Sequence, residues 1–143
     1  MANVFDVANY ILEKKGATSV MKLQKLVYYS QAWSLTWNEQ PLFEEDIQAW
    51  VNGPVVRGLY NAHRGNYKVE PNFFNGNSES LNKYQMETID KVLAFYGDKD
   101  PQWLSELTHM ESPWIEARKA LNNLERGEVV ISKESMLEYY SSL

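Results

Sequence analysis

The sequence predicts a mainly α-helical fold: a compact, single-domain multi-helix bundle spanning residues 1–143, with a few short β-strands or extended segments. Three observations lead to this prediction. Apolar side chains recur at three- and four-residue spacing along much of the chain, which is the period of a helix face. Asp100-Pro101 and Ser112-Pro113 each place a capping side chain before proline, as helix starts do. No repeat, low-complexity tract or linker divides the chain.

The first part of the chain predicts two helices. Residues 3–15 carry one apolar stripe and are followed by Gly16, a residue suited to the end of a helix. A second helix, capped by Thr18 or Ser19, is expected to run to about Trp37. Its apolar face is wide, so we expect it to be the central helix, contacted from more than one side.

The middle of the chain combines extended segments with a predicted third helix. The alternating residues 47–51 indicate a short extended piece, and the acidic run 44–46 before them lacks the spacing of a calcium loop. Gly53-Pro54 follows. Because proline suits the first position of a helix, we predict that a helix begins there. Residues 64–79 are irregular, and a loop of this length is usually functional or contains a strand or turn.

The second half predicts four helices with clear breaks between them. They are expected at residues 81–96, 102–110 and 114–124, and after a cap at Ser132. The apolar run 129–131 before that cap predicts a short strand.

Composition excludes several classes of chemistry. The chain contains no cysteine, so disulfides, thiolate metal sites and cysteine nucleophiles are ruled out. The formal net charge is −5, which argues against a general phosphate-binding surface and makes nucleic acid an unexpected partner. The N-terminal stretch is unlike a signal peptide, and no run approaches the ~20 apolar residues of a membrane span. We therefore expect a cytoplasmic protein without a membrane partner.

No catalytic constellation is recognisable in the sequence. Nucleophile elbows, phosphate-binding glycine loops and histidine metal motifs are absent, so we expect no catalytic residue, metal or cofactor. A zinc site would need His63 and His109 to converge with an acid from a distant segment. His109, near Trp114 at a helix end, is expected to lock a helix corner; the alternative is acid–base chemistry with Glu111 or Glu116.

Three separated blocks of the sequence resemble the Panacea antitoxin domain. They are K-L-Q-K-L-x-Y-Y at 22–29, P-L-F…I-x-A-W-x-x-G-P-V-V at 41–56, and L-T-H…P-W-x-x-A-R at 107–118. Several blocks in the right order are more specific than any one short motif. The family includes SocA-like antitoxins and GepA-like phage-associated proteins. The resemblance implies a largely helical antitoxin whose partner is a protein toxin encoded by a neighbouring gene.

The resemblance leaves three mechanisms open. The leading one is direct, stoichiometric binding of the toxin. The second is a proteolytic adaptor that delivers the toxin to a AAA+ protease. The third is an enzyme that reverses toxin chemistry. A homo-oligomer is also open, because exposed aromatic side chains serve self-association equally well.

We expect the partner-binding patch where the aromatic residues of the second helix approach the Gly53-Pro54 corner. Aromatic residues make up 13% of the chain, and protein interfaces favour them. The candidates are Lys22, Lys25, Tyr28, Tyr29, Trp33, Trp50, Arg57 and Tyr60, with the two lysines at the rim. In the alternative interpretation the lysines merely extend along the surface and the aromatic side chains serve the fold. Four residues are assigned structural roles: Gly53, Pro54, His109 and Trp114.

Overall fold

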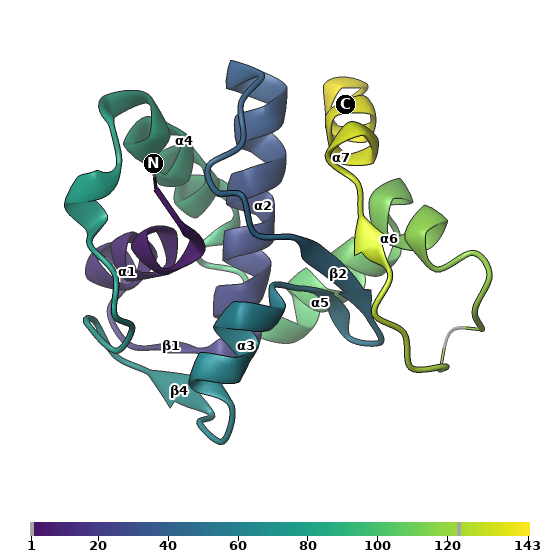
Figure 1. Ribbon diagram of the computed structural model, residues 1–143, viewed down its shortest axis with the longest axis horizontal. Coiled ribbons are helices and arrows are strands. Elements are labelled where there is room, and N and C mark those ends of the chain that lie inside the picture. The colour runs from purple at the N-terminus through teal and green to yellow at the C-terminus, as the bar shows by residue number, and fades with distance from the viewer. Residues whose placement is uncertain (1, 123) are drawn as a thin grey trace.

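The computed structural model describes residues 2–122 and 124–143, and in this part of the chain seven α-helices and five short strands form (Figure 1). The elements in chain order are α1 (Val4–Lys15), β1 (Thr18–Ser19), α2 (Val20–Asn38), β2 (Ile47–Trp50), β3 (Gly53–Val55), α3 (Arg57–His63), β4 (Lys68–Val69), the 3₁₀ turn η1 (Ser78–Ser80), α4 (Lys83–Tyr96), α5 (Pro101–His109), α6 (Ser112–Ala117), β5 (Val130–Ile131) and α7 (Lys133–Ser141). The predicted mainly α-helical fold is confirmed.

Helix α2 is the centre of the molecule. Helices α1 and α4 lie on one side of it and α7 on the other, while α5 and β3 contact it near its N-terminal half (Figure 1). Twelve of its side chains are buried, which is the wide face that the sequence predicted. Ser19 caps the helix by accepting a hydrogen bond from the Lys22 amide at 3.2 Å. Because α2 contacts elements on several sides and protein cores are close-packed, a substitution at one of its buried positions should disturb the packing of its neighbours.

Gly53-Pro54 does not begin a helix, so that prediction is wrong. Gly53 has a φ of +121°, outside the helical region, and the segment forms β3 of an antiparallel hairpin in which Gln48 pairs with Val55. Proline is tolerated there because β3 is the edge of the β3-β2-β5 sheet. Helix α3 begins three residues later, at Arg57.

The irregular stretch 64–79 contains a short strand, as the sequence allowed. Strand β4 pairs with β1 in antiparallel fashion, with Val69 opposite Thr18. Strand β5 and the Ser132 cap of α7 are confirmed as well, since Ser132 Oγ accepts from the Ser135 amide at 3.1 Å.

Helix α6 is shorter than the predicted 114–124, because it ends at Ala117. The buried Arg118 takes non-helical dihedrals there and donates to the carbonyl oxygens of Asn122 and Glu125, which turns the chain. Ser112 lies inside the helix rather than capping it, and the capping position is Glu111. The Glu111 carboxylate makes no cap bond; its Oε1 instead accepts from two tyrosine hydroxyls.

Candidate functional site

The β2–β3 hairpin is fixed to α5 and α6 by four side chains. Four consecutive hairpin carbonyl oxygens accept one hydrogen bond each: Ala49 O from Arg118 Nη1 at 2.9 Å, Trp50 O from Trp114 Nε1 at 2.7 Å, Val51 O from His109 Nε2 at 2.7 Å, and Asn52 O from Ser105 Oγ at 2.7 Å. Buried carbonyl groups need such partners, and here side chains supply them. The hairpin is therefore a rigid support for the side chains it carries.

Gly53 passes closely over the Lys25 side chain. A Cβ atom at position 53 would lie 2.6 Å from Lys25 Cε and 3.0 Å from Thr108 Oγ1, and the φ of +121° also favours glycine. The hairpin thus covers Lys25 and buries it, so that only 2% of this residue is exposed.

A pocket of about 810 Å³ opens between the start of α2, the hairpin, α3 and residues 126–128. One wall is a row of four side chains. The Arg57 guanidinium lies 5.6 Å from the centre of the Trp50 ring, Trp50 packs edge-on against Tyr60 at 4.9 Å, and Tyr60 packs edge-on against His63 at 5.6 Å. Arg57 also forms an ion pair with Glu128 across the pocket.

Lys25 lines this pocket from below the surface. Burial lowers the pKa of its ammonium group to about 8. Within the described part of the chain, no hydrogen bond or ion pair of this ammonium group is present, and no charged group offsets the cost of burying it. A lysine buried without a partner is rare in proteins.

His63 lines the same pocket as a neutral imidazole. The Gln24 side chain accepts from the Val56 amide at 2.9 Å and donates to the Val56 carbonyl, so its Nε2 is the donor atom. That atom lies 3.0 Å from His63 Nε2, which must therefore accept, and the ring proton sits on Nδ1. Burial lowers the pKa of His63; a hydrogen bond to the backbone of His63 itself opposes this effect, and the positive charge of Lys25 adds to it. Nδ1 is buried without a hydrogen-bond partner among the described residues.

Two residues that the sequence predicted for the partner-binding surface are buried instead, so that prediction is wrong for them. Tyr28 and Tyr29 are 1% and 0% exposed, and belong to the core. Tyr29 stacks on Tyr96 at 4.1 Å and donates to Glu111 Oε1 at 2.7 Å; Tyr140 donates to the same oxygen at 2.7 Å. Burial raises the pKa of Glu111. We call Tyr28, Tyr29, Trp33, Tyr96, Glu111 and Tyr140 the tyrosine cluster.

The other candidates divide between two places. Trp50, Arg57 and Tyr60 come together at the pocket, whereas half-buried Trp33 donates to the Tyr96 hydroxyl at 3.0 Å and lies with the tyrosine cluster. Lys22 is half-buried and does not line the pocket. Lys25 lines it but is not a rim residue, because it is buried. Sequence reasoning missed the pocket residues Arg64, Arg126 and Glu128, which carry no motif.

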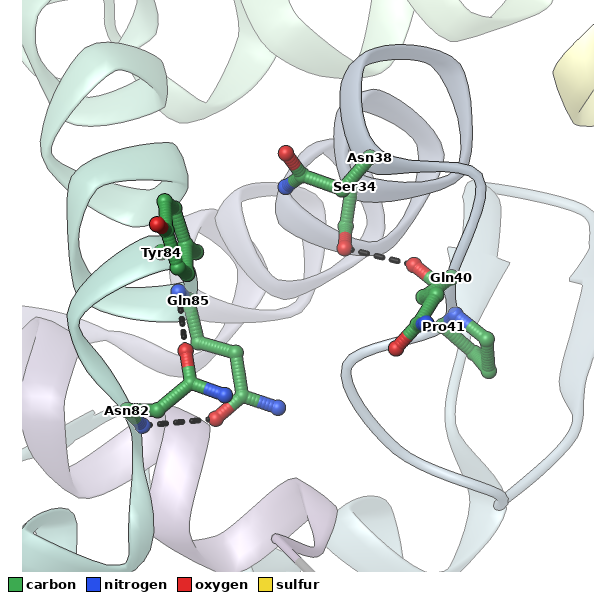
Figure 2. Close-up of a pocket in the computed structure, with 7 residues that line it drawn as sticks. All are labelled: Ser34, Asn38, Gln40, Pro41, Asn82, Tyr84 and Gln85. Carbon is green, nitrogen blue, oxygen red and sulfur yellow. Dashed lines mark hydrogen bonds between the residues drawn. The ribbon is translucent and has the colours of Figure 1, made fainter.

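A second, smaller pocket of about 260 Å³ lies between the end of α2 and the start of α4 (Figure 2). Several of its polar groups are already paired. Ser34 Oγ donates to the Gln40 carbonyl at 2.6 Å, and Asn82 and Gln85 form the reciprocal cap of α4. None of the lining side chains carries a charge. This pocket offers few free groups to a ligand.

The fold and the site define a small helical domain with a cationic, aromatic pocket. Residues 23–115, well over half of the chain, match the family described as antitoxin SocA-like, Panacea domain, and the chain belongs to that family. No curated protein and no solved structure matches the chain. Among the described residues, no helix has the length and apolar character to cross a membrane, and no group of three or more His, Asp or Glu is placed to hold a metal ion.

Proposed function

We propose that this protein is an antitoxin that neutralises a cognate protein toxin by direct, stoichiometric binding, without catalysis of its own. The family supports an antitoxin role in general terms. The observation that carries direct binding is the wall formed by Trp50, Arg57 and Tyr60. Tryptophan, tyrosine and arginine contribute most of the energy at protein interfaces. The hairpin that carries Trp50 is already rigid, which reduces the entropy lost on binding.

The groups that acid–base catalysis would use are engaged elsewhere. Both ring nitrogens of His109 lie against backbone carbonyl oxygens, those of Ser105 and Val51. Glu111 is buried and accepts two tyrosine hydroxyls. Glu116 is exposed at a distance of 3.9 Å from the Lys119 ammonium. This arrangement supports a binding protein in preference to an enzyme.

The test is co-expression with the adjacent open reading frame, followed by measurement of growth and of toxin abundance. We expect growth to recover while the toxin remains present in a complex that co-elutes with this protein. Titration of purified toxin should reach full inhibition at a fixed ratio. Light scattering of each component alone would show whether this protein self-associates.

Arg57→Ala gives a sharper version of the test, because Arg57 is exposed and its loss leaves the core intact. Rescue should weaken, whereas Lys83→Ala, a charge removal at an exposed site outside the pocket, should leave rescue unchanged. Disappearance of the toxin in a protease-dependent way would contradict direct neutralisation and favour the adaptor. Rescue at sub-stoichiometric amounts would instead favour an enzyme.

A further inference from the structure

The pocket contains an ammonium group that the fold leaves unsatisfied. Lys25 is 2% exposed, lines the pocket, and has no hydrogen-bond or ion-pair partner among the described residues. An unpaired buried charge destabilises a folded protein, and an apolar residue of similar size would avoid that cost. The folded chain alone gives no reason for a lysine at this position, but an anionic ligand would.

His63 adds a second donor on the same pocket. Its Nδ1 carries the ring proton, because Gln24 requires Nε2 to accept, and this N–H is buried with no partner outside its own residue in the described part of the chain. Burial without a partner normally costs a polar group part of its hydrogen-bonding energy. The two buried polar groups of the lining that have no partner outside their own residue in the described part of the chain are therefore both donors, and an acceptor would satisfy both.

The charge of the pocket has the opposite sign to that of the chain. Its lining includes Lys25, Arg57, Arg64 and Arg126 and one carboxylate, Glu128, which gives a formal charge of +3. The whole chain carries −5. A local positive potential in an acidic protein attracts an anionic partner to this site and repels it from most of the remaining surface.

From these three observations we propose that the pocket binds a carboxylate of the toxin, an acidic side chain or the C-terminal carboxylate, with Lys25 as its ion-pair partner and His63 as a second donor. The proposal rests on the proposed function, since it takes the ligand to be a segment of the toxin. Trp50 and Tyr60 would pack against the apolar part of that segment, and the exposed Arg57 would contact the segment at the edge of the pocket.

A carboxylate fits the pocket better than a phosphate chain. The most buried cation of the lining is a lysine, whose ammonium group is a compact point charge, and the lining also includes the apolar side chains of Val55 and Trp50. Nucleic acid presents a charge about every 1.7 Å and requires an extended basic surface. A carboxylate next to an apolar side chain matches the one buried ammonium group and the apolar part of the lining.

The first experiment compares Lys25→Met with Lys22→Met in binding to the cognate toxin. Lys22 lies on the same helix but outside the pocket, so it is the matched control. We expect Lys25→Met to weaken toxin binding at least tenfold while its unfolding midpoint stays the same or rises. Lys22→Met should bind as the wild type does. Unchanged affinity in folded Lys25→Met would overturn the proposal, even if direct neutralisation holds.

The second experiment needs no toxin and therefore separates the two proposals. Phenylacetate, its neutral analogue phenylacetamide and inorganic phosphate are titrated into protein with labelled lysine side chains, and the Lys25 resonance is followed by NMR. We expect phenylacetate to shift it and phenylacetamide to leave it unchanged. No shift with phenylacetate, or a stronger shift with phosphate, would overturn the carboxylate site. A shift with phenylacetate would support it even if the adjacent gene product proved harmless.

Discussion

Two ionisable side chains, Glu111 and the Lys25 of α2, are buried, but only Glu111 has hydrogen-bond partners among the described residues. Glu111 is 5% exposed, and one of its carboxylate oxygens accepts hydrogen bonds from Tyr29 and Tyr140 inside the tyrosine cluster. Lys25 is 2% exposed and has no such partner in the described residues. The first group is completed by the fold, which is what a structural role requires. The second is left incomplete beside an open pocket, and a ligand can complete it.

The surroundings of the two groups differ in the same sense. The tyrosine cluster is closed on itself, with rings from α2, α4 and α7 packed in stacked, edge-on and tilted pairs. The pocket wall uses the same residue types but leaves Trp50 and Tyr60 partly exposed. Aromatic content alone therefore does not identify the binding surface, because most of the large rings of α2 belong to the core. The predictions below test this contrast, from the largest expected effect to the smallest.

Tyr29→Ala should have the largest effect, and it should act on the fold. The substitution removes a fully buried ring that stacks on Tyr96 and takes a donor from Glu111. We expect a loss of about 3–5 kcal/mol in the free energy of unfolding, as for other buried aromatic residues. Chemical denaturation measures it. A stable Tyr29→Ala variant that lost only toxin binding would contradict the assignment of Tyr29 to the core.

Lys25→Met should change the stability in the opposite direction and stabilise the fold. The pKa of Lys25 falls from 10.5 to about 8 on burial, so the charged form destabilises the folded state at neutral pH by as much as about 3 kcal/mol. Methionine fills similar space without a charge, and we expect the variant to be more stable than the wild type. Denaturation at pH 7 tests this, and a destabilised variant would show that Lys25 has an internal partner after all.

The same shift predicts a pH dependence. Between about pH 8 and pH 10.5 the unfolded chain keeps the Lys25 proton and the folded protein has released it. Because the unfolded state then binds more protons, the Lys25 contribution makes wild-type stability rise with pH across this window. Lys25→Met should lack this contribution, and Lys22→Met should retain it.

Gly53→Ala should have an intermediate effect, because Gly53 lies directly against the Lys25 side chain. An added Cβ would meet Lys25 Cε at 2.6 Å, at a φ that side chains rarely adopt. We expect a loss of about 1–3 kcal/mol and weaker toxin binding, since Lys25 has to move. Gly58→Ala is the matched control: it lies in α3 with no atom near its Cβ, and should be neutral or slightly stabilising.

The sequence was sufficient for most of the helices but not for the pocket. Apolar spacing and caps predicted α1, α2, α4, α5 and α7 because those signals are local. Gly53-Pro54 misled the prediction, since the φ of Gly53 is determined by a hairpin whose carbonyl oxygens bind α5 and α6, far along the chain. The same long-range packing covers Lys25. No local pattern distinguishes a lysine that extends along a surface from one that a distant hairpin buries.

Which aromatic residues are exposed was equally beyond the sequence. Tyr28 and Tyr29 lie beside Lys25 on α2, yet the tyrosines face the cluster closed by Tyr140 while the lysine lines the pocket. The helix period places these side chains around the helix, but only the positions of α7 and the hairpin decide which side is covered. Trp50, Arg57 and Tyr60 were correctly grouped near the Gly53-Pro54 corner because they are close in the chain.

Glu111→Gln should have the smallest effect on stability. The pH dependence that it removes is opposite in sign to that of Lys25. Burial raises the pKa of Glu111, so between its unfolded and folded pKa values the folded protein holds a proton that the unfolded chain has released. The Glu111 contribution therefore makes stability fall as pH rises through this acidic window. Glutamine keeps an oxygen that accepts from Tyr29 and Tyr140 but has no charge to bury. The Glu111→Gln variant should therefore lose this pH-dependent fall in stability, which denaturation at several acidic pH values measures. Toxin binding should be unchanged, because Glu111 belongs to the closed cluster and does not line the pocket.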